Sequence, residues 1–444
     1  MKRIVIYIPS LILIVLAISR LANAQEVDDI LPDAAPQAGN IAPQTAAYGP
    51  WEIAVLDDQN DVGSHLSMSV DWTTGMAAVA YYDATAGDLK LAQQTPGNCG
   101  PNQSWNCTIL DNTSSADVGQ HVSLAYRNDG GYGVVYFDAA NGINRFTSPV
   151  AGIQGEVIEY VPGSTVGLFN ALTYDLANTP HVAYNRSVSG PMDFGYANRI
   201  GAGGNCSLTW SCSVVQNYAG NISMDTSLLG AIGIAYNGVG GFLGYAHPVN
   251  SGGNCGEGKW QCDSLDNGSM LGTSLYMSRC LFPPCQTPTQ MAYYNYTSQQ
   301  VKHAVYVGSG QGNCPNNNNW RCSVIDSVGQ TANYSALGIA LVMVGSQPVI
   351  IYQDLNDQAN GIVKMAYPQA NGNCGTNNSY YCAVIDDGAR GGGFVSVGSA
   401  LDAVVVDGRI HIAYYDTNHG DLLLAYEPAP APEQETIYLP YIQK

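Results

Sequence analysis

One short pattern recurs seven times in this chain of 444 residues. Each copy is a run of small or aliphatic residues that ends in Tyr and leads into a polar turn. The copies are centred on Tyr81, Tyr136, Tyr184, Tyr236, Tyr293, Tyr352 and Tyr414. Successive tyrosines are 48 to 62 residues apart. Self-similarity with a period in this range is typical of a repeat fold.

The residues around each copy predict four short strands per unit. In the last unit, the runs CAVIDDG, FVSVGSALDAVVVDG, RIHIAYYD and GDLLLAYEP follow one another. β-branched and aromatic runs separated by Gly, Asn and Asp are typical of strands, and no stretch after the N-terminal leader has helical periodicity. The sequence therefore predicts an all-β, seven-bladed β-propeller of four-stranded blades. A solenoid is the alternative.

The two ends of the repeat array predict how the ring closes. The segment WEIAVLDD, which begins at Trp51, matches the fourth strand of other units, such as WNCTILD and WRCSVID. The last predicted strand, DLLLAYEP, is the third of its unit. We expect the N-terminal strand to pair in the last blade, because an open array would leave strand edges unpaired.

The N-terminus has the features of a secretory signal peptide. Two basic residues, Lys2 and Arg3, precede an apolar run over 4–18 and the A-x-A sequence Ala22–Ala24. This arrangement predicts a signal peptide over residues 1–24. No later stretch is long and apolar enough for a membrane span, so we expect a secreted or cell-surface protein.

Composition divides the remaining chain into three parts. Residues 25–50 are rich in Ala, Pro and Gln and are predicted to be a linker, and residues 51–427 form the propeller. Residues 428–444 are a Pro-rich tail, which we expect to be extended and semi-rigid where the prolines cluster. Its last eight residues suit an anchoring or sorting signal or a frayed end. We expect a monomer.

All twelve cysteines fall in close pairs. In an exported chain, such pairing predicts disulfides, and zinc binding is the alternative. The predicted pairs are Cys99–Cys107, Cys206–Cys212, Cys255–Cys262, Cys280–Cys285, Cys314–Cys322 and Cys374–Cys382. Five of them would join the third strand of a unit to its fourth and staple the scaffold.

The net charge restricts the partners of the chain. Without the leader, 13 basic residues face 35 acidic ones, which gives −22. A field of this sign repels nucleic acid and anionic membrane surfaces. It is compatible with neutral sugars, cations or a basic protein, and an acidic surface also simply keeps a protein in solution.

One face of the predicted propeller collects polar candidates. His65 and His121 begin innermost strands in the first and second blades, and His419 lies in a turn of the seventh, which closure makes their neighbour. The turns after the Tyr pattern on this face carry Asp83, Asp138, Asp354 and Asp416. His65, His121, Asp83 and Asp138 are candidates for general acid–base chemistry, and the histidines with nearby carboxylates could hold a cation such as calcium. Asp and Gly are equally what a hairpin turn requires.

A second aromatic residue follows the Tyr of several repeats. Side chains alternate along a strand, so one residue of each pair packs between blades and the other approaches the face. Tyr82, Tyr294 and Tyr415, with Asp83, Asp138, Asp354, Asp416 and His419, are the predicted ligand-binding residues, because flat rings and short polar groups suit sugars. Packing alone is the alternative for the tyrosines.

The apolar-Ala-Tyr strand followed by a turn resembles the repeats of exported bacterial propellers of the sialidase-like superfamily. The resemblance covers residues 51–427 and implies the fold. It does not extend to the activity, because the Asp box S-x-D-x-G-x-x-W is absent from every unit. Sialidases also need three arginines that grip a carboxylate, and by register only Arg186 and Arg390 can lie on the ligand face.

Two hypotheses about function follow. The favoured one is an exported, noncatalytic propeller that binds a glycan or another extracellular protein through its funnel face, without a cofactor. The alternative is a carbohydrate-active enzyme, a glycoside hydrolase or polysaccharide lyase, with its active site in the funnel. Glycosidases require two placed carboxylates, and no pattern in the sequence marks such a pair.

Overall fold

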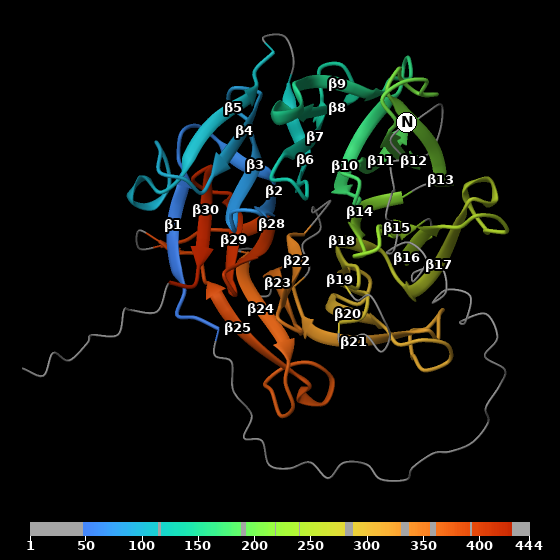
Figure 1. Cartoon of the computed structure of the whole chain (residues 1–444). Coiled ribbons are helices and arrows are strands. Elements are labelled where there is room, and N and C mark those ends of the chain that lie inside the picture. The colour runs from blue at the N-terminus through green and yellow to red at the C-terminus, as the bar shows by residue number, and fades with distance from the viewer. Residues whose placement is uncertain are drawn as a thin grey trace, which may run out of the picture. The chain divides into compact units, whose positions relative to one another are not determined.

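A computed structural model describes residues 48–113, 117–187, 192–217, 219–238, 240–279, 287–329, 337–355, 361–390 and 393–428 (Figure 1). The predicted signal peptide, residues 25–47 of the predicted linker and residues 429–444 of the tail lie outside this part, so these predictions remain open. No helix in the described part of the chain is long and apolar enough to cross a membrane.

Seven four-stranded antiparallel sheets form the blades, each with its first strand innermost. Blade 1 contains β2 (Val62–Asp71), β3 (Met76–Asp83), β4 (Asp88–Gln93) and β5 (Asn106–Asp111). Blade 2 contains β6 (Val118–Tyr126), β7 (Tyr132–Asp138), β8 (Ile143–Ser148) and β9 (Ile153–Glu159). Blade 3 contains β10 (Thr165–Tyr174), β11 (Pro180–Ser187), β12 (Met192–Arg199) and β13 (Trp210–Asn217).

The remaining blades repeat this order. Blade 4 contains β14 (Ala219–Thr226), β15 (Ile232–Gly238), β16 (Phe242–Pro248) and β17 (Trp260–Asn267). Blade 5 contains β18 (Met270–Tyr276), β19 (Gln290–Asn295), β20 (Gln300–Tyr306) and β21 (Trp320–Ser327). Blade 6 contains β22 (Ile339–Val344), β23 (Gln347–Asp354), β24 (Ile362–Pro368) and β25 (Tyr380–Asp386).

The seventh blade closes the ring. It consists of β28 (Val397–Val406), β29 (Arg409–Asp416), β30 (Asp421–Tyr426) and, at its outer edge, β1 (Glu52–Asp57) from the N-terminal end. β1 pairs antiparallel with β30, with Glu52 opposite Tyr426. The predicted closure is therefore confirmed. A short hairpin, β26 (Ala389–Arg390) and β27 (Gly393–Phe394), precedes this blade.

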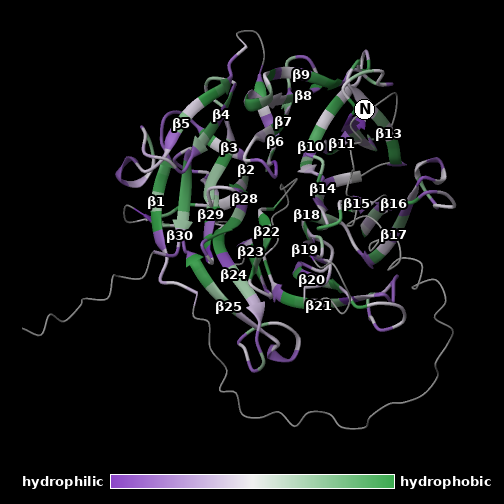
Figure 2. Ribbon diagram, in the orientation of Figure 1, coloured by the Kyte–Doolittle hydropathy of each residue, from purple (hydrophilic) through white to green (hydrophobic). Residues whose placement is uncertain are grey.

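The core is divided among the boundaries between blades. The strands are predominantly hydrophobic and the connecting loops hydrophilic (Figure 2). Residues of consecutive blades form each buried cluster; Leu422 of β30 and Val62 of β2, for example, belong to one cluster. Burial between sheets is what holds a radial repeat together.

The recurring Tyr packs at these boundaries, as expected for one residue of each aromatic pair. Each of the seven is at most 1% exposed. In six, the hydroxyl donates a hydrogen bond to a carboxylate of the preceding blade's outer strand, at 2.6 to 2.8 Å; the pairs are Tyr81–Asp57, Tyr136–Asp111, Tyr184–Glu159, Tyr293–Asp266, Tyr352–Asp326 and Tyr414–Asp386. Tyr236 has no such bond in the described residues, because Gln216 stands where the other blades carry an acid.

We expect Tyr136→Phe to lower the free energy of unfolding by about 1–3 kcal/mol, because Asp111 then loses a buried hydrogen bond. Tyr236→Phe is the matched control and should cost less than Tyr136→Phe, since Tyr236 has no carboxylate partner among the described residues. Urea unfolding followed by tryptophan fluorescence measures both. Equal losses would contradict the role assigned to the carboxylates.

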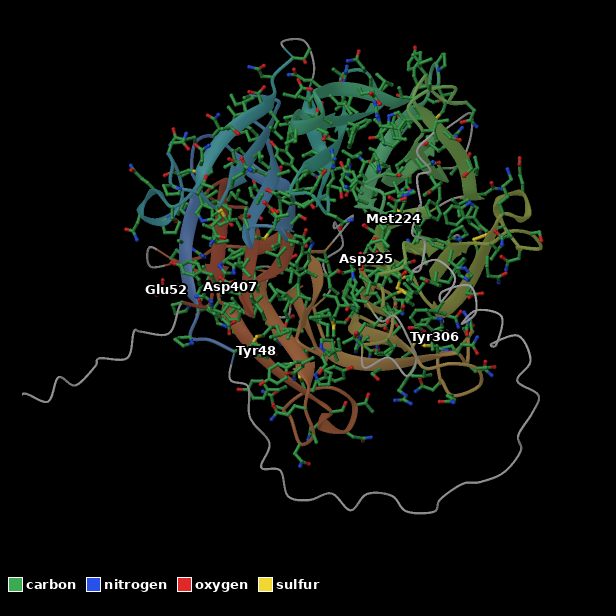
Figure 3. All side chains as sticks on the ribbon, in the orientation of Figure 1. Tyr48, Glu52, Met224, Asp225, Tyr306 and Asp407 are labelled. Atoms are coloured by element: carbon green, nitrogen blue, oxygen red, sulfur yellow. A yellow bond between two sulfur atoms is a disulfide. The ribbon has the colours of Figure 1, made fainter. Side chains whose placement is uncertain are left out.

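Side chains also link the innermost strands. Leu124 of β6 donates its amide N–H to Ser67 of β2, and the amide of Met68 donates to Asp402 of β28. Asp225, labelled beside Met224 on β14 in Figure 3, accepts from the amide of Met277 in blade 5. Burial raises the pKa of Asp402 to about 6 and also raises that of Asp225. Asp402 thus occupies the position at which blade 1 uses Ser67, whereas Asp225 lies two residues beyond the equivalent Ser223.

Five of the six predicted disulfides are formed, and Cys280 and Cys285 lie outside the described residues. Each disulfide joins the loop after a third strand to the fourth strand, as expected. The Asn before the first Cys bonds through its amide to the backbone of the second, as Asn98 does with Cys107. The loops of blades 1 and 5 also reach the preceding blade. In blade 1, for example, the Gly100 amide donates a hydrogen bond to the Leu56 carbonyl of β1. Short helical turns lie in some of these loops, at Pro101–Gln103, Gly256–Gly258 and Thr376–Asn378, and another follows β8 at Pro149–Ala151.

Candidate functional site

The innermost strands of all seven blades surround a central cavity of about 410 Å³. In Figure 1 these strands, β2, β6, β10, β14, β18, β22 and β28, form the inner ring. In each blade, two consecutive residues in or next to the innermost strand line the cavity. The first set is His65, His121, Phe169, Asn221, Gly272, Gly338 and Ala400; the second is Leu66, Val122, Asn170, Ile222, Thr273, Ile339 and Leu401.

The first set makes the cavity asymmetric. Blades 1 to 3 place the rings of His65, His121 and Phe169 on one side, whereas blades 5 to 7 place Gly or Ala on the other. A side chain at Gly338 would collide with the neighbouring backbone, because its Cβ would lie 2.2 Å from the Gly398 carbonyl oxygen. The space is therefore bounded by rings on one wall and by backbone and small side chains on the opposite wall.

The three rings form a continuous arc. The ring centroids of His65 and His121 are 4.6 Å apart, and those of His121 and Phe169 are 5.0 Å apart, with interplanar angles near 50°. Tilted aromatic pairs at such distances are mutually attractive. The arc therefore presents ring surface from three consecutive blades to one cavity.

Backbone bulges direct these side chains toward the cavity. The pairing of β6 with β7 and of β10 with β11 shifts register around His121 and Phe169. His121 has φ 49° and Phe169 φ 51°, in the left-handed region. Such conformations cost about 1–3 kcal/mol in a residue other than Gly and cluster at functional sites. The strain is a first indication that these positions serve more than packing.

The histidines of the arc are neutral at neutral pH. Burial lowers the pKa of His65 to about 4, although Asp117 partly opposes this, and burial with the neighbouring His65 lowers the pKa of His121 to about 3. Neither ring has a hydrogen bond to another described residue. A neutral imidazole offers one donor and one acceptor. The two rings can therefore both stack on a ligand and bond to its hydroxyl groups.

The cavity is uncharged where the structure describes it. Besides the rings and aliphatic groups, its lining contains hydroxyls and amides, including those of Ser64, Thr273, Ser399 and Asn221. Asp, Glu, Lys and Arg do not occur among the described lining residues. This composition suits a ligand that has apolar faces and hydroxyl groups but no net charge.

The structure brings together only part of the predicted histidine cluster. His65 and His121 are neighbours, but His419 does not line the cavity, and its Nδ1 lies 3.0 Å from Asp416 Oδ2. That contact with Asp416 raises the pKa of His419. Within the described residues, no three His, Cys, Asp or Glu side chains are placed to share a metal ion. The predicted cation site therefore gains no support from the geometry.

The four predicted aspartates are buried in turns. Asp83 accepts from the amides of Thr85 and Ala86, and Asp416 from those of Asn418 and His419. Asp138 pairs with Arg145 at 2.7 Å and Asp354 with Lys364 at 3.0 Å. None of the four lines the central cavity as described. Their geometry matches the turn-forming alternative, and a ligand-binding role stays an untested prediction.

In blades 1, 5 and 7, the second aromatic residue contacts the segment that leads into the next blade. The Tyr82 hydroxyl donates to Asp117 at 2.6 Å, and the Tyr415 hydroxyl to Asp61 at 2.7 Å. Tyr294 is 2% exposed, and its hydroxyl contacts the Gly329 carbonyl. Of the three, Tyr415 lines the cavity. A role in ligand binding is therefore compatible with the position of Tyr415, beside its packing role.

Sequence reasoning missed Phe169, Asn170 and Asn221 as cavity residues. A signal was present, because a Gly stands a few residues before the cavity position in each of blades 1, 2 and 3, at Gly63, Gly119 and Gly167, all with positive φ. Aligning the repeats on this Gly places Phe169 at the position of His121.

Fold and cavity together define the class of protein as a closed seven-bladed β-propeller with a central site. No family model and no curated protein matches the chain. Similar solved structures include the propeller domain of Cps50 (Swd1) from Myceliophteria thermophila, with 7% identity over 84% of this chain and 98% of that one and a TM-score of 0.46.

Sialidases and a further propeller are also similar in fold. The NanB sialidase from Streptococcus pneumoniae has 10% identity over 84% of this chain and 68% of its own, with a TM-score of 0.42. AofleA from Arthrobotrys oligospora has 11% identity over 83% of each chain, with a TM-score of 0.39. At these identities the likeness concerns the fold alone.

Proposed function

We propose that this propeller binds an uncharged carbohydrate in its central cavity and acts in recognition rather than catalysis. The observation that carries the proposal is the arc of His65, His121 and Phe169 facing a wall of small residues. Pockets of a few hundred Å³ that combine ring surface with a few polar groups are typical ligand sites. A pyranose offers C–H faces for the rings and hydroxyls for the imidazoles and amides.

The proposal places this recognition outside the cytoplasm, on a secreted or cell-surface protein. The five disulfides support it, because such bonds persist in oxidising compartments. A glycan, free or carried by an extracellular protein, is the proposed partner. The alternative of a glycoside hydrolase or lyase is less favoured, since the described lining residues are uncharged and hydrolysis uses two placed carboxylates.

We expect His121→Ala and Phe169→Ala each to weaken binding of a neutral glycan at least tenfold, which corresponds to about 1.4 kcal/mol. His247→Ala is the matched control, because His247 does not line the cavity. A neutral and acidic glycan panel, followed by titration calorimetry on the best neutral binder, measures the effect. Preference for acidic glycans, or unchanged affinity in both cavity variants, would contradict the proposal.

The same panel separates binding from catalysis. Turnover of a polysaccharide that disappears in the double variant His65→Ala with His121→Ala would favour the enzyme hypothesis. Retention without any product, measured by chromatography of the incubated glycans, is the expected result.

A further inference from the structure

Two asparagines break the internal pattern of the repeats at the boundary of blades 2 and 3. Asn170 stands where the other six blades carry Leu66, Val122, Ile222, Thr273, Ile339 and Leu401. Asn144 stands on the third strand where the others carry Leu89, Phe194, Leu243, Val301, Val363 and Leu422. Both positions are thus apolar in nearly every other blade.

Both amides are buried without partners. Asn144 is 0% exposed and Asn170 is 9% exposed. Neither the nitrogen nor the oxygen of either amide has a hydrogen-bond partner within the described residues. An unmade hydrogen bond at a buried polar group costs about 1–3 kcal/mol. Aliphatic side chains of the kind found in other blades would avoid this cost.

The two residues border the same bulge beside the cavity. Asn170 lines the cavity and directly follows Phe169, whose ring belongs to the aromatic arc. Asn144 lies against Gly167 at the start of this bulge, where a Cβ would approach the Asn144 Cβ to 2.8 Å. One unpaired amide is thus at the cavity wall, and another lies behind the same loop.

In natural proteins, residues that break a local folding rule, such as buried polar groups without hydrogen-bond partners, concentrate at functional sites. An amide that is both donor and acceptor matches a hydroxyl group, which is also both. A hydroxyl held by Asn170 would remain in contact with the ring of Phe169 and next to the imidazole of His121. The position therefore combines hydrogen bonding with stacking in one corner of the cavity.

We propose that Asn170 determines which neutral sugar the cavity accepts, by bonding to one ring hydroxyl, and that Asn144 keeps the floor of this subsite polar. This inference rests on the proposed function. The Asn170 amide is covered in the structure described, so its side chain rotates toward the cavity when the sugar binds.

The test measures stability and selectivity in the same variants. Asn170→Val copies Val122, and Asn144→Leu copies Leu89. Urea unfolding gives the stability, and titration calorimetry gives the affinity for methyl glucoside, methyl galactoside, methyl mannoside and their monodeoxy analogues. We expect Asn170→Val to be more stable than the natural chain, to bind its preferred glycoside at least tenfold more weakly, and to lose discrimination against one deoxy analogue.

The outcomes separate the two proposals. A less stable Asn170→Val with unchanged discrimination between the glycosides would assign Asn170 a structural role and overturn the inference alone. If the natural chain binds none of these glycosides and none of the neutral glycans of the panel, the proposed function fails and the inference fails with it. Asn144→Leu should gain stability and bind the preferred glycoside more weakly than the natural chain does; a loss of stability or an unchanged affinity would overturn its part.

Discussion

Replacing Asp57 by Ala should lower the free energy of unfolding by about 3–5 kcal/mol, because it removes the nearest carboxylate of the buried Lys90, whose other carboxylate neighbour, Asp83, is 3.9 Å away. Asp57 is 5% exposed and lies at the end of β1, the strand that closes the ring. Its Oδ2 accepts hydrogen bonds from the Tyr81 hydroxyl at 2.6 Å and from Lys90 Nζ. Lys90 is 9% exposed, so its charge cannot regain full hydration.

The position of Asp57 should enlarge this effect. Losing its contacts loosens β1 and exposes the edge of β30, which pairs with it. Asp111 occupies the equivalent position in blade 1 and accepts from Tyr136 and Thr113, but its described contacts include no lysine. Asp111→Ala should therefore cost less than Asp57→Ala.

Asp58→Ala is the matched control, because Asp58 is exposed and its one described bond joins the neighbouring Gln59. Urea unfolding of the three variants should give losses in the order Asp57, Asp111, Asp58. Adding Lys90→Met to Asp57→Ala should restore part of the stability, since it removes the buried charge that lost its nearest carboxylate. Equal stability of Asp57→Ala and Asp58→Ala would refute the closing role of this network.

Acidification should destabilise the propeller well before its carboxylates are all protonated. Burial lowers the pKa of His65 and His303 to about 4 and that of His121 to about 3. An unfolded histidine has a pKa of about 6.5. Between these values the unfolded chain takes up protons that the folded chain does not, so stability is full above pH 6.5 and falls as pH falls.

Asp402 changes the folding stability in the opposite direction as the pH falls. Its pKa is raised to about 6 in the folded chain, so the folded chain holds a proton that the unfolded chain, with a pKa of about 3.9, has released. Its contribution is full below pH 3.9 and is lost as pH rises through 6. Each group changes stability by about 1.4 kcal/mol per pH unit within its window. Three histidines outweigh one aspartate, and we expect a net loss on the order of 6 kcal/mol between pH 7 and pH 4.5.

Two variants divide this pH dependence between its causes. His121→Phe copies Phe169, which has the same backbone conformation in the next blade, and should reduce the loss on acidification. Asp402→Ser copies Ser67 and should raise stability at pH 7 while making the loss on acidification larger. Urea unfolding at half-unit steps from pH 7.5 to 4.5 measures both. An unchanged slope in His121→Phe would contradict the assignment.

The repeat pattern predicted much of the fold because each unit builds the same sheet from local signals. The seven Tyr copies, the spare strand at Trp51 and the paired cysteines led to the blades, the ring closure and five disulfides, all confirmed. The packing role of the Tyr followed from strand alternation. Its carboxylate partner did not, since it comes from the outer strand of a neighbouring blade.

The candidate site was less accessible from sequence. His65 and His121 were chosen by register, and the structure places them side by side. Phe169 and Asn170 were missed because the bulges in β10 shift the alternation that register reasoning depends on. Asp83, Asp138, Asp354 and Asp416 were ambiguous between turn and ligand. Only the structure shows that Asp83 and Asp416 accept from amides of their own turns and that Asp138 and Asp354 pair with a basic residue of the next strand.

By itself, the sequence determined the number of blades, the four strands of each, the closing strand and the disulfide loops, because these depend on short-range patterns repeated along the chain. Only the tertiary structure decided which seven pairs of residues face the cavity and that rings gather on one side of it. That arrangement depends on bulges and on contacts between blades about 50 residues apart or more, and a one-residue shift at a bulge turns a side chain from the core into the cavity.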